Sequence, residues 1–298
     1  MYMQQNLIGQ RGSSWTFGTA EIATTLLQED SETSVLEFLE QRPLHTAMMA
    51  GLVRDNGLRH QFNRGNFFGC HNRFGELEGV ALVGHATLFE SRTDRALKQL
   101  ADVAQACTMT HMIMGEQKPL DSFLESYTEQ QKGQSRYCRE HLLELRLPVE
   151  IRNEVPQLRL ATVDDLSLIA PIHAQMAFEE SGVDPLKRDP EGFHKRYACR
   201  IERNRTWVWI DDGKPIFKAD LISDTPRVAY LEGIWVNPDS RGQGQGTDCL
   251  LQLAKSLLVN SDALCVFVNE QNQNALRFYQ RAGFRDRGAF DTIFLQRN

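Results

Sequence analysis

One short segment, residues 230–258, limits the possible folds of this 298-residue chain more than any other. It opens with an apolar run that has the composition of a buried strand and ends at Pro238. A glycine-rich stretch follows directly: Asp239-Ser240-Arg241-Gly242-Gln243-Gly244-Gln245-Gly246-Thr247. Leucines and alanines at helical spacing then predict an amphipathic helix up to Leu258. A strand, a glycine turn and a helix N-terminus in this order gather backbone N–H groups around one point, which suits a pyrophosphate.

Three phosphate-binding loops can be compared with the glycine-rich stretch. A dinucleotide-binding loop has the pattern G-x-G-x-x-G, whereas Gly242, Gly244 and Gly246 give G-x-G-x-G. A P-loop ends in Gly-Lys-Ser/Thr, whereas Gly246 is followed by Thr247 without a lysine. An acyl-CoA loop has the form Arg/Gln-x-x-Gly-x-Gly/Ala after a V-x-P strand end, and Arg241, Gly244 and Gly246 match it in order. The third pattern fits best.

A second block of sequence supports the acyl-CoA loop. It follows the pattern N-x-x-A-x-x-x-Y-x-x-x-G-F that closes GNAT acetyltransferase domains: Asn272, Ala275, Tyr279, Gly283 and Phe284. Because the two blocks are correctly ordered and spaced, residues 158–298 resemble the GNAT superfamily. The whole chain, including the loop Ser181-Gly182-Val183-Asp184-Pro185-Leu186 and the strand Phe217-Lys218-Ala219, is similar to a bacterial group of two-domain GNAT proteins whose N-terminal half has no assigned function. The resemblance implies acetyl-CoA as cosubstrate, held between the strand before the loop and the strand after the helix.

The resemblance also implies roles for single residues. Backbone groups near Ile234 and Val236 are expected to pair with the pantetheine arm, and Asn272 belongs to the expected cofactor site. The loop residues are expected to hold the pyrophosphate: Arg241, Gly242, Gln243, Gly244, Gln245, Gly246 and Thr247. Tyr279 stands where GNAT domains usually carry the acid that protonates the CoA thiolate. The alternative for Tyr279 is a half-buried helix residue whose hydroxyl lies in solvent.

Glu232 is a candidate general base. Because side chains alternate along a strand, we expect Glu232 to share a face with Tyr230, Ile234 and Val236. A carboxylate on that face could deprotonate an incoming ammonium, directly or through a water. The alternative is a solvated or salt-bridged strand residue, since GNAT enzymes differ in the position of the base and many have none.

The order of predicted elements gives the fold class. Pro148 and Pro156 flank a short polar segment, which predicts a linker between a domain of residues 1–150 and a domain of residues 157–298. Thr162 and Asp165 form a capping box before a helix. Further elements of the C-terminal half are strands at 158–161, 206–210, 216–222, 230–236 and 263–268, helices at 191–204 and 274–281, and closing strands at Phe284 and 290–295.

The N-terminal half shows a weaker version of the same order, which indicates an internal duplication. Its expected elements are helices at 32–39, 44–54, 95–107 and 120–131, and strands at 67–71, 80–89, 111–114 and 139–147. We therefore predict an α/β (α+β) protein with tandem GNAT-like domains, each a mixed, mostly antiparallel sheet flanked by helices. No glycine stands between Gly84 and Gly115, where a duplicated phosphate loop would lie. The N-terminal domain is thus expected to be degenerate and structural.

Bulk properties exclude several functions. The net charge of −6 argues against a nucleic-acid partner, and no apolar stretch reaches the length of a membrane span. Met1–Gly12 lacks the apolar core of a signal peptide. The six cysteines form no C-x-x-C pair, which favours a cytoplasmic location. The eight histidines show no metal-ligand spacing, so no metal is assigned.

Two functions remain. The first is an acetyl-CoA-dependent N-acetyltransferase, in which an amine of a small molecule, an amino-acid-like compound or a peptide attacks the thioester directly. The second is an acyl-CoA-binding regulatory or interaction protein without turnover, against which the retained Tyr279 and Glu232 argue. Thiol release from acetyl-CoA in the presence of amines distinguishes the two. The sequence names neither the acceptor nor the oligomeric state, and a homo-oligomer is left open.

Overall fold

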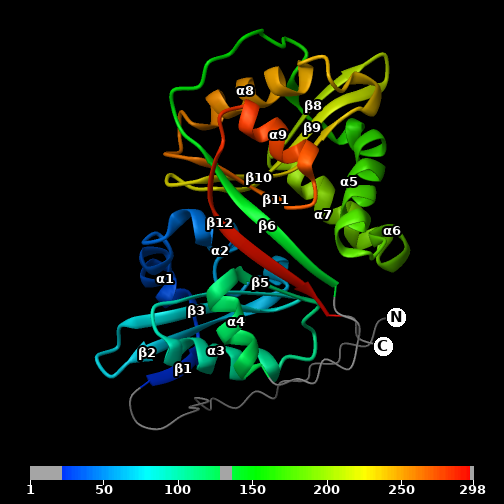
Figure 1. The fold of residues 1–298 in the computed structure, drawn as a ribbon. Helices are drawn as coiled ribbons and strands as arrows, with labels where there is room; N and C mark the ends of the chain where they lie inside the picture. The colour runs from blue at the N-terminus through cyan, green and yellow to red at the C-terminus, as the bar shows by residue number, and fades with distance from the viewer. Residues whose placement is uncertain (1–21, 128–135, 296–298) are drawn as a thin grey trace.

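The computed structural model describes residues 22–127 and 136–295, and its strands form one continuous sheet (Figure 1). The N-terminal half contributes β1 (Ile22–Leu26), α1 (Glu32–Leu39), α2 (Pro43–Asn56), β2 (Gly65–Asn72), β3 (Leu77–Gly84), β4 (Ala86–Ser91), α3 (Asp94–Gln105), β5 (Met112–Glu116), α4 (Gln117–Ser126) and β6 (Arg136–Leu145). The C-terminal half contributes β7 (Arg159–Leu160), α5 (Leu166–Ser181), α6 (Pro185–Arg188), α7 (Pro190–Glu202), β8 (Thr206–Asp211), β9 (Lys214–Asp224), β10 (Ala229–Val236), α8 (Gln245–Leu257), β11 (Leu264–Asn269), α9 (Gln273–Arg281) and β12 (Arg285–Phe294).

The two halves repeat one another in topology. The twelve strands lie in the order β1-β2-β3-β4-β5-β12-β6-β11-β10-β9-β8-β7, which reads alike from both ends when β1–β6 are matched with β7–β12. Neighbouring strands are antiparallel throughout, except for the parallel pairs β4–β5 and β10–β11, which correspond. Duplication of one unit accounts for this correspondence.

The last strand of each half lies in the sheet of the other half. β12 is inserted between β5 and β6, and β6 is inserted between β12 and β11. In Figure 1 these two strands, green and red, run side by side through the middle of the molecule. The domains of residues 1–150 and 157–298 stay predictions. Dividing the chain between them would separate β6 from β11, its neighbour in the sheet.

Helices cover the sheet on both faces. α8 and α9 pack on one face of the C-terminal half around Leu231, Leu250 and Leu264, whereas α5 and α7 lie on the other side of these strands (Figure 1). α2 of the N-terminal half also reaches β9 and β10. The predicted capping box is present: the Thr162 backbone N–H donates to the Asp165 carboxylate at 2.8 Å just before α5.

Some elements differ from the prediction. β1 and the single turn α6 were not predicted, because each is too short to show a period. The predicted strand at 80–89 is interrupted at His85, so β3 and β4 are separate strands. At the preceding Gly84, a Cβ would lie 2.2 Å from the Arg64 carbonyl oxygen. The predicted closing strands are a single strand, β12. Met1–Gly12 and the last residues of the helix predicted at 120–131 lie outside the described residues.

Candidate active site

The glycine-rich loop joins the end of β10 to the start of α8. Gly242 and Gly244 have φ angles of 79° and 85°, in the left-handed region that glycine adopts without strain. A Cβ built on either residue would meet no protein atom within 4 Å. Gly244 is also the N-cap of α8, so no side chain caps this helix terminus. The loop thus leaves open space beside the electropositive end of a helix.

Other loop residues fix this segment to the strand. A Cβ on the buried Gly246 would lie 2.6 Å from Val236 Cγ2, so this glycine allows α8 to pack against the end of β10. Arg241 donates from Nε to the Val236 carbonyl oxygen at 3.1 Å. Asn272 accepts a hydrogen bond from the Ala275 N–H at 3.0 Å and caps α9. These contacts are within the protein, and the predicted cofactor contacts of these residues stay predictions.

β10 and β11 are paired only at their beginnings. The parallel pairing joins Ala229 with Leu264 and Tyr230 with Cys265. Further along β10 the register with β9 is irregular between Glu232 and Trp235, where Gly233 has a φ angle of 59°. A β-bulge of this kind bends and twists the strand that carries it. The backbone groups of β10 that follow Tyr230 are therefore not used in pairing with β11.

This bulge corrects the predicted strand face. Ile234 and Val236 pack in the same apolar cluster as Leu231, on the side of α8 and α9, whereas Tyr230 belongs to the cluster on the opposite face. Simple alternation, which put Ile234 and Val236 on the face of Tyr230 and Glu232, was wrong. The extra residue of the bulge shifts the alternation by one position.

A buried group of charged residues lies under the bulge. Lys218 and Asp220, both 0 % exposed, stand on one face of β9 with Nζ and Oδ2 2.5 Å apart. Thr206 donates to Asp220 Oδ1 at 2.8 Å. His173 and Arg200 each place a nitrogen 3.6 Å from Asp220 Oδ2. Two buried nitrogens of this group, His173 Nδ1 and Arg200 NH1, have no hydrogen-bond partner within the described part of the chain.

Burial and charge set the ionisation of this group. Burial alone would raise the pKa of Asp220, but the charges of Lys218 and Arg200 outweigh it and hold that pKa below its usual value. Burial lowers the pKa of Lys218, and Asp220 offsets part of this effect. Burial, together with the charge of Lys218, lowers the pKa of His173 to about 3, so this imidazole is neutral at neutral pH.

Glu232 points to the same side of the sheet as this group. Its Oε2 lies 3.5 Å from the hydroxyl of Tyr230. Burial raises its pKa above the usual value, while Arg200 and Lys218 act in the opposite direction. A carboxylate with a raised pKa is a stronger base, which is the property that the predicted role requires.

Glu140 is a second carboxylate near Glu232, and the sequence analysis missed it. It is only 8 % exposed and accepts a hydrogen bond from the Thr292 hydroxyl at 2.9 Å. Burial raises its pKa to about 7, and the negative charge of Glu232 contributes to the rise. Glu140 lies on β6, which comes from the N-terminal half. No local pattern reveals such a neighbour, because the exchange of β6 and β12 creates the contact.

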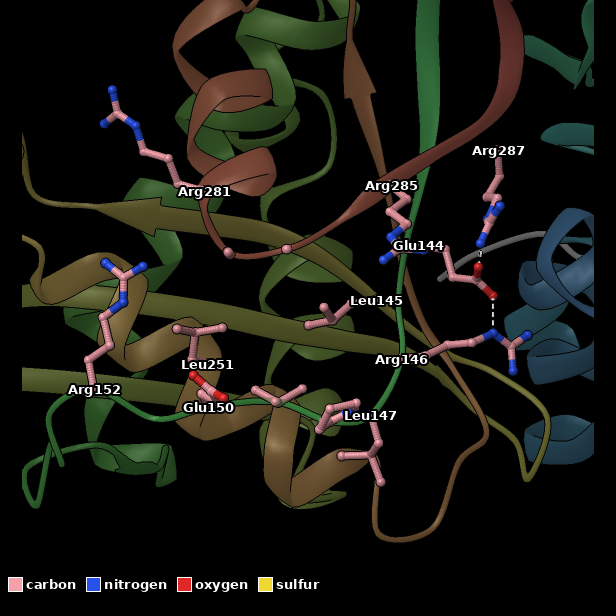
Figure 2. Close-up of a pocket in the computed structure, with 14 residues that line it drawn as sticks. Glu144, Leu145, Arg146, Leu147, Glu150, Arg152, Leu251, Arg281, Arg285 and Arg287 are labelled. Atoms are coloured by element: carbon pink, nitrogen blue, oxygen red, sulfur yellow. Dashed lines mark hydrogen bonds and ion pairs between the residues drawn. The ribbon is translucent and has the colours of Figure 1, made fainter.

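A cavity of about 560 Å³ lies away from these residues, at the end of β6 (Figure 2). Five arginines contribute to its lining: Arg146, Arg152, Arg281, Arg285 and Arg287. Glu144 is held between two of them, with Arg146 Nε at 2.7 Å and Arg287 Nε at 2.6 Å. None of the predicted site residues lines this cavity, so the cavity is not the predicted acyl-CoA site.

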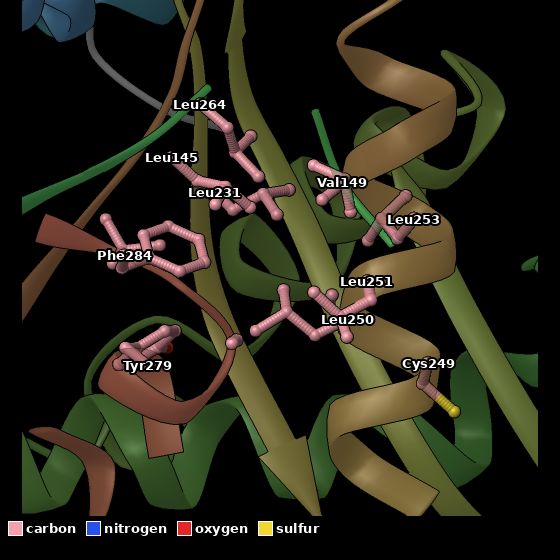
Figure 3. Close-up of a cluster of buried hydrophobic side chains, with 14 of the residues drawn as sticks. Leu145, Val149, Leu231, Cys249, Leu250, Leu251, Leu253, Leu264, Tyr279 and Phe284 are labelled. Atoms are coloured by element: carbon pink, nitrogen blue, oxygen red, sulfur yellow. The ribbon is translucent and has the colours of Figure 1, made fainter. Parts of the chain in front are cut away.

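Tyr279 lies in the apolar cluster under α8 and α9 (Figure 3). It is 8 % exposed, and its ring packs edge-on against those of Phe278 and Phe284, with centroids 5.1 and 5.3 Å away. Burial raises its pKa well above the usual value of a tyrosine. The hydroxyl is therefore protonated at neutral pH and stays so in more alkaline solution than an exposed tyrosine would.

The N-terminal half lacks these features at the corresponding positions. The helix that follows β4 is capped by Thr93, whose hydroxyl accepts from the Ala96 N–H at 3.2 Å. Phe123 is the seventh residue of α4, as Tyr279 is of α9. Its ring stacks on that of Phe89, with centroids 4.4 Å apart, and Phe89 in turn fills the space beside Gly115.

Residues 172–284 match the model of the Acetyltransferase (GNAT) family. This segment is a domain of the GNAT acetyltransferase family. The GNAT domain contains the glycine-rich loop, Glu232 and Tyr279, and the family implies an acyl-CoA cosubstrate. The predicted family and the enzyme class, an acyltransferase, are thereby confirmed. No curated protein sequence matches the chain.

Solved structures share the fold of the whole chain, GNAT domain and N-terminal half together. A Drosophila protein has a TM-score of 0.67 at 12 % identity, covering 92 % of this chain and 98 % of that one. A tandem GNAT protein from the clavulanic acid biosynthesis pathway has a TM-score of 0.56 at 12 % identity, covering 93 % and 100 %. A GNAT-family acetyltransferase from Colwellia psychrerythraea has a TM-score of 0.53 at 13 % identity, covering 92 % and 99 %. The predicted fold class is confirmed.

Two kinds of feature are absent from the described part of the chain. Within residues 22–127 and 136–295, no group of three or more His, Cys, Asp or Glu side chains is arranged to hold a metal ion. In the same residues, no helix is long and apolar enough to cross a membrane.

Proposed function

We propose that the protein is an acetyl-CoA-dependent N-acetyltransferase with its acyl-CoA site in the GNAT domain. The observation that carries the proposal is the open loop before α8. Gly242 and Gly244 leave room where a Cβ would stand, and α8 has no side-chain cap. The pyrophosphate of CoA needs this combination of free space and exposed N–H groups at a helix N-terminus. When bound, acetyl-CoA supplies the acetyl group as a reactive thioester.

The backbone of β10 supports the same site. Beyond Tyr230 the strand is unpaired toward β11, so its N–H and C=O groups are available to an extended ligand such as the pantetheine arm. Ile234 and Val236 lie in this unpaired part of β10. A backbone N–H at the bulge can also donate to the thioester oxygen as negative charge develops on it.

Two side chains are proposed to handle protons. Glu232, with its raised pKa, accepts a proton from the incoming ammonium, directly or through a water. Tyr279, with its raised pKa, stays protonated and donates a hydrogen bond to the departing thiolate. Glu140 adds a second carboxylate on the acceptor side, which favours a cationic amine as acceptor. The acceptor is proposed to be an amine of a small molecule, an amino-acid-like compound or a peptide.

The N-terminal half is proposed to bind no acyl-CoA. Thr93 caps the helix terminus that would face a pyrophosphate, and Phe89 and Phe123 occupy the space that would correspond to the thioester site. Its proposed contribution is structural: it supplies β6 with Glu140 and places α2 against β9.

Thiol release tests the proposal. Purified protein is incubated with acetyl-CoA and a panel of primary amines, and free CoA is measured with a thiol reagent. The expected result is acceptor-dependent release, with an acetylated amine detected by mass spectrometry. Tight acetyl-CoA binding without release for any amine would support the second candidate, a regulatory acyl-CoA-binding protein.

A further inference from the structure

Lys218 has no part in the functions described so far, although it is the only lysine among the fully buried large side chains of the described residues. Its stem lies on β9, opposite Trp235 of β10. Its ammonium donates to Asp220 at 2.5 Å and to the carbonyl oxygen of Gly233 at 3.0 Å. Burying an ammonium is costly unless its charge is compensated. The fully buried position of Lys218 therefore indicates a specific role for this cation.

The second contact identifies the peptide on which Lys218 acts. The Gly233 C=O and the Ile234 N–H belong to one planar trans peptide, in which they point in opposite directions. The Ile234 N–H therefore points away from Lys218 Nζ. The other neighbour of β10 is β11, and the pairing of these two strands has already ended at Tyr230 and Cys265.

The surroundings hold the ammonium against this peptide. Thr206 and the hydroxyl of Tyr197 contact Asp220 at 2.8 and 3.5 Å, which fixes the counter-ion. Gly233 leaves only the space that the cation needs, because a Cβ there would lie 2.9 Å from Lys218 Nζ. The Tyr197 ring lies 5.6 Å from Nζ, so one of its neighbours is an aromatic face.

We propose that Lys218 is a positioning residue that orients and polarises the Gly233–Ile234 peptide, so that the Ile234 N–H becomes the donor to the thioester carbonyl oxygen. A cation on the carbonyl oxygen of an amide draws electrons from its nitrogen, and hydrogen bonds in such a chain strengthen one another. In a water-excluded site, one preorganised donor of this kind stabilises an oxyanion strongly. The inference rests on the proposed acetyl-CoA site and assigns the source of its electrophilic activation.

Infrared spectroscopy of bound acetyl-CoA labelled with ¹³C at the acetyl carbonyl tests the inference without an acceptor. A hydrogen bond to the thioester oxygen lowers the carbonyl stretching frequency. The wild-type protein should therefore bind the labelled acetyl-CoA and shift its carbonyl band to lower frequency than in water. Failure to bind would contradict the proposed function itself. Binding without the shift would contradict only the Lys218 inference, whether or not any variant folds.

The decisive variant is the pair Lys218→Met with Asp220→Asn, which removes the ammonium and its nearest carboxylate together and leaves Arg200 with the charge of Glu232 nearby. We expect it to retain acetyl-CoA affinity and to lose most of the carbonyl shift. With an accepted amine, kcat should fall about tenfold while the KM for acetyl-CoA stays unchanged, since removing a whole oxyanion donor costs about 10²–10³-fold. A double variant that binds acetyl-CoA with the full carbonyl shift would overturn the inference.

A control variant removes a half-exposed ion pair that joins the turn of the same hairpin to the segment before β11. Arg227 and Asp262 form a 2.6 Å pair beside the turn that joins β9 to β10, at the opposite end from the bulge. The variant Arg227→Met with Asp262→Asn should keep both the affinity and the carbonyl shift of the wild type. Loss of the shift in this control would show that the band responds to general loosening of the hairpin, which also contradicts a specific role of Lys218.

Discussion

At the scale of single residues, the raised pKa of Tyr279 determines how its hydroxyl can assist the reaction. A CoA thiol is far more acidic than a buried tyrosine, because a thiol has a pKa of about 8.5 and burial raises the pKa of Tyr279. We therefore expect the hydroxyl to stabilise the thiolate by a hydrogen bond. Tyr279→Phe should lower kcat and kcat/KM together by about 10², with little change in acetyl-CoA affinity by calorimetry. Wild-type kcat in the Phe variant, with chemistry rate-limiting, would rule out this role.

If Glu232 is the general base, its replacement should change the pH dependence of kcat/KM. An acceptor ammonium has a pKa near ten, so a base matters most where little free amine is present. Glu232→Gln should depress kcat/KM most at neutral pH, and the loss should shrink as the pH rises. Steady-state kinetics from pH 6 to pH 10 measure this. A uniform loss at every pH would indicate substrate positioning, and no loss would make Glu232 a structural residue.

The raised pKa of Glu140 should make the free energy of unfolding depend on pH. Because its folded pKa of about 7 lies above the unfolded value, the folded state holds the extra proton between pH 4.5 and pH 7. Stability from this group is therefore lost as the pH rises through that window. Glu140→Gln keeps an acceptor for Thr292 and should match the wild type at pH 4. At pH 8 it should be more stable, by up to about 3 kcal/mol. Urea unfolding at both values tests this, and an equal effect at both would contradict the raised pKa.

Single residues were predictable where their role is local. The glycine turn and the Thr162 cap follow from spacing along the chain, because turns and caps depend on near neighbours. Tyr279 was singled out by the resemblance to the GNAT family, and its role stays a prediction. The roles of Glu140 and Lys218 were not predictable from the sequence. Each residue is proposed to act on a residue of another strand, and only the register of the sheet brings each one close to its partner.

At the scale of elements, the exchanged strands β6 and β12 decide how the molecule can be divided. Most helices and strands were predicted within a few residues from their periodicity. The exchange was not, because an apolar strand such as 139–147 carries no mark of its partner. The bulge in β10 was missed for a similar reason, since Gly233 alone does not reveal where alternation breaks.

The exchange leads to a test by truncation. A fragment of residues 157–298 lacks β6, which separates β11 from β12, so we expect it to aggregate or to lack a cooperative unfolding transition. A fragment of residues 136–298 retains β6 and should be more soluble, with partial acetyl-CoA binding. Circular dichroism with thermal unfolding compares the two. A 157–298 fragment that is as stable as the longer one would show that the exchange contributes little.

At the scale of the whole molecule, duplication has left two halves with the same topology and different loops. In the C-terminal half, α8 follows Gly244 and its N-terminus has no side-chain cap. In the N-terminal half, the side chain of Thr93 caps the equivalent N-terminus of α3. The chain should therefore bind one CoA, and the N-terminal half should affect the reaction only through β6 and α2.

Calorimetric titration of CoA tests this account most directly. The wild type should bind one CoA per chain. Gly244→Val should abolish binding, because a side chain would occupy the open space beside α8. Gly75→Val is the matched control: its φ angle of 82° imposes the same backbone strain, and a Cβ there also meets nothing within 4 Å, so it should bind CoA as the wild type does. Unchanged affinity in Gly244→Val, or two sites in the wild type, would contradict the account.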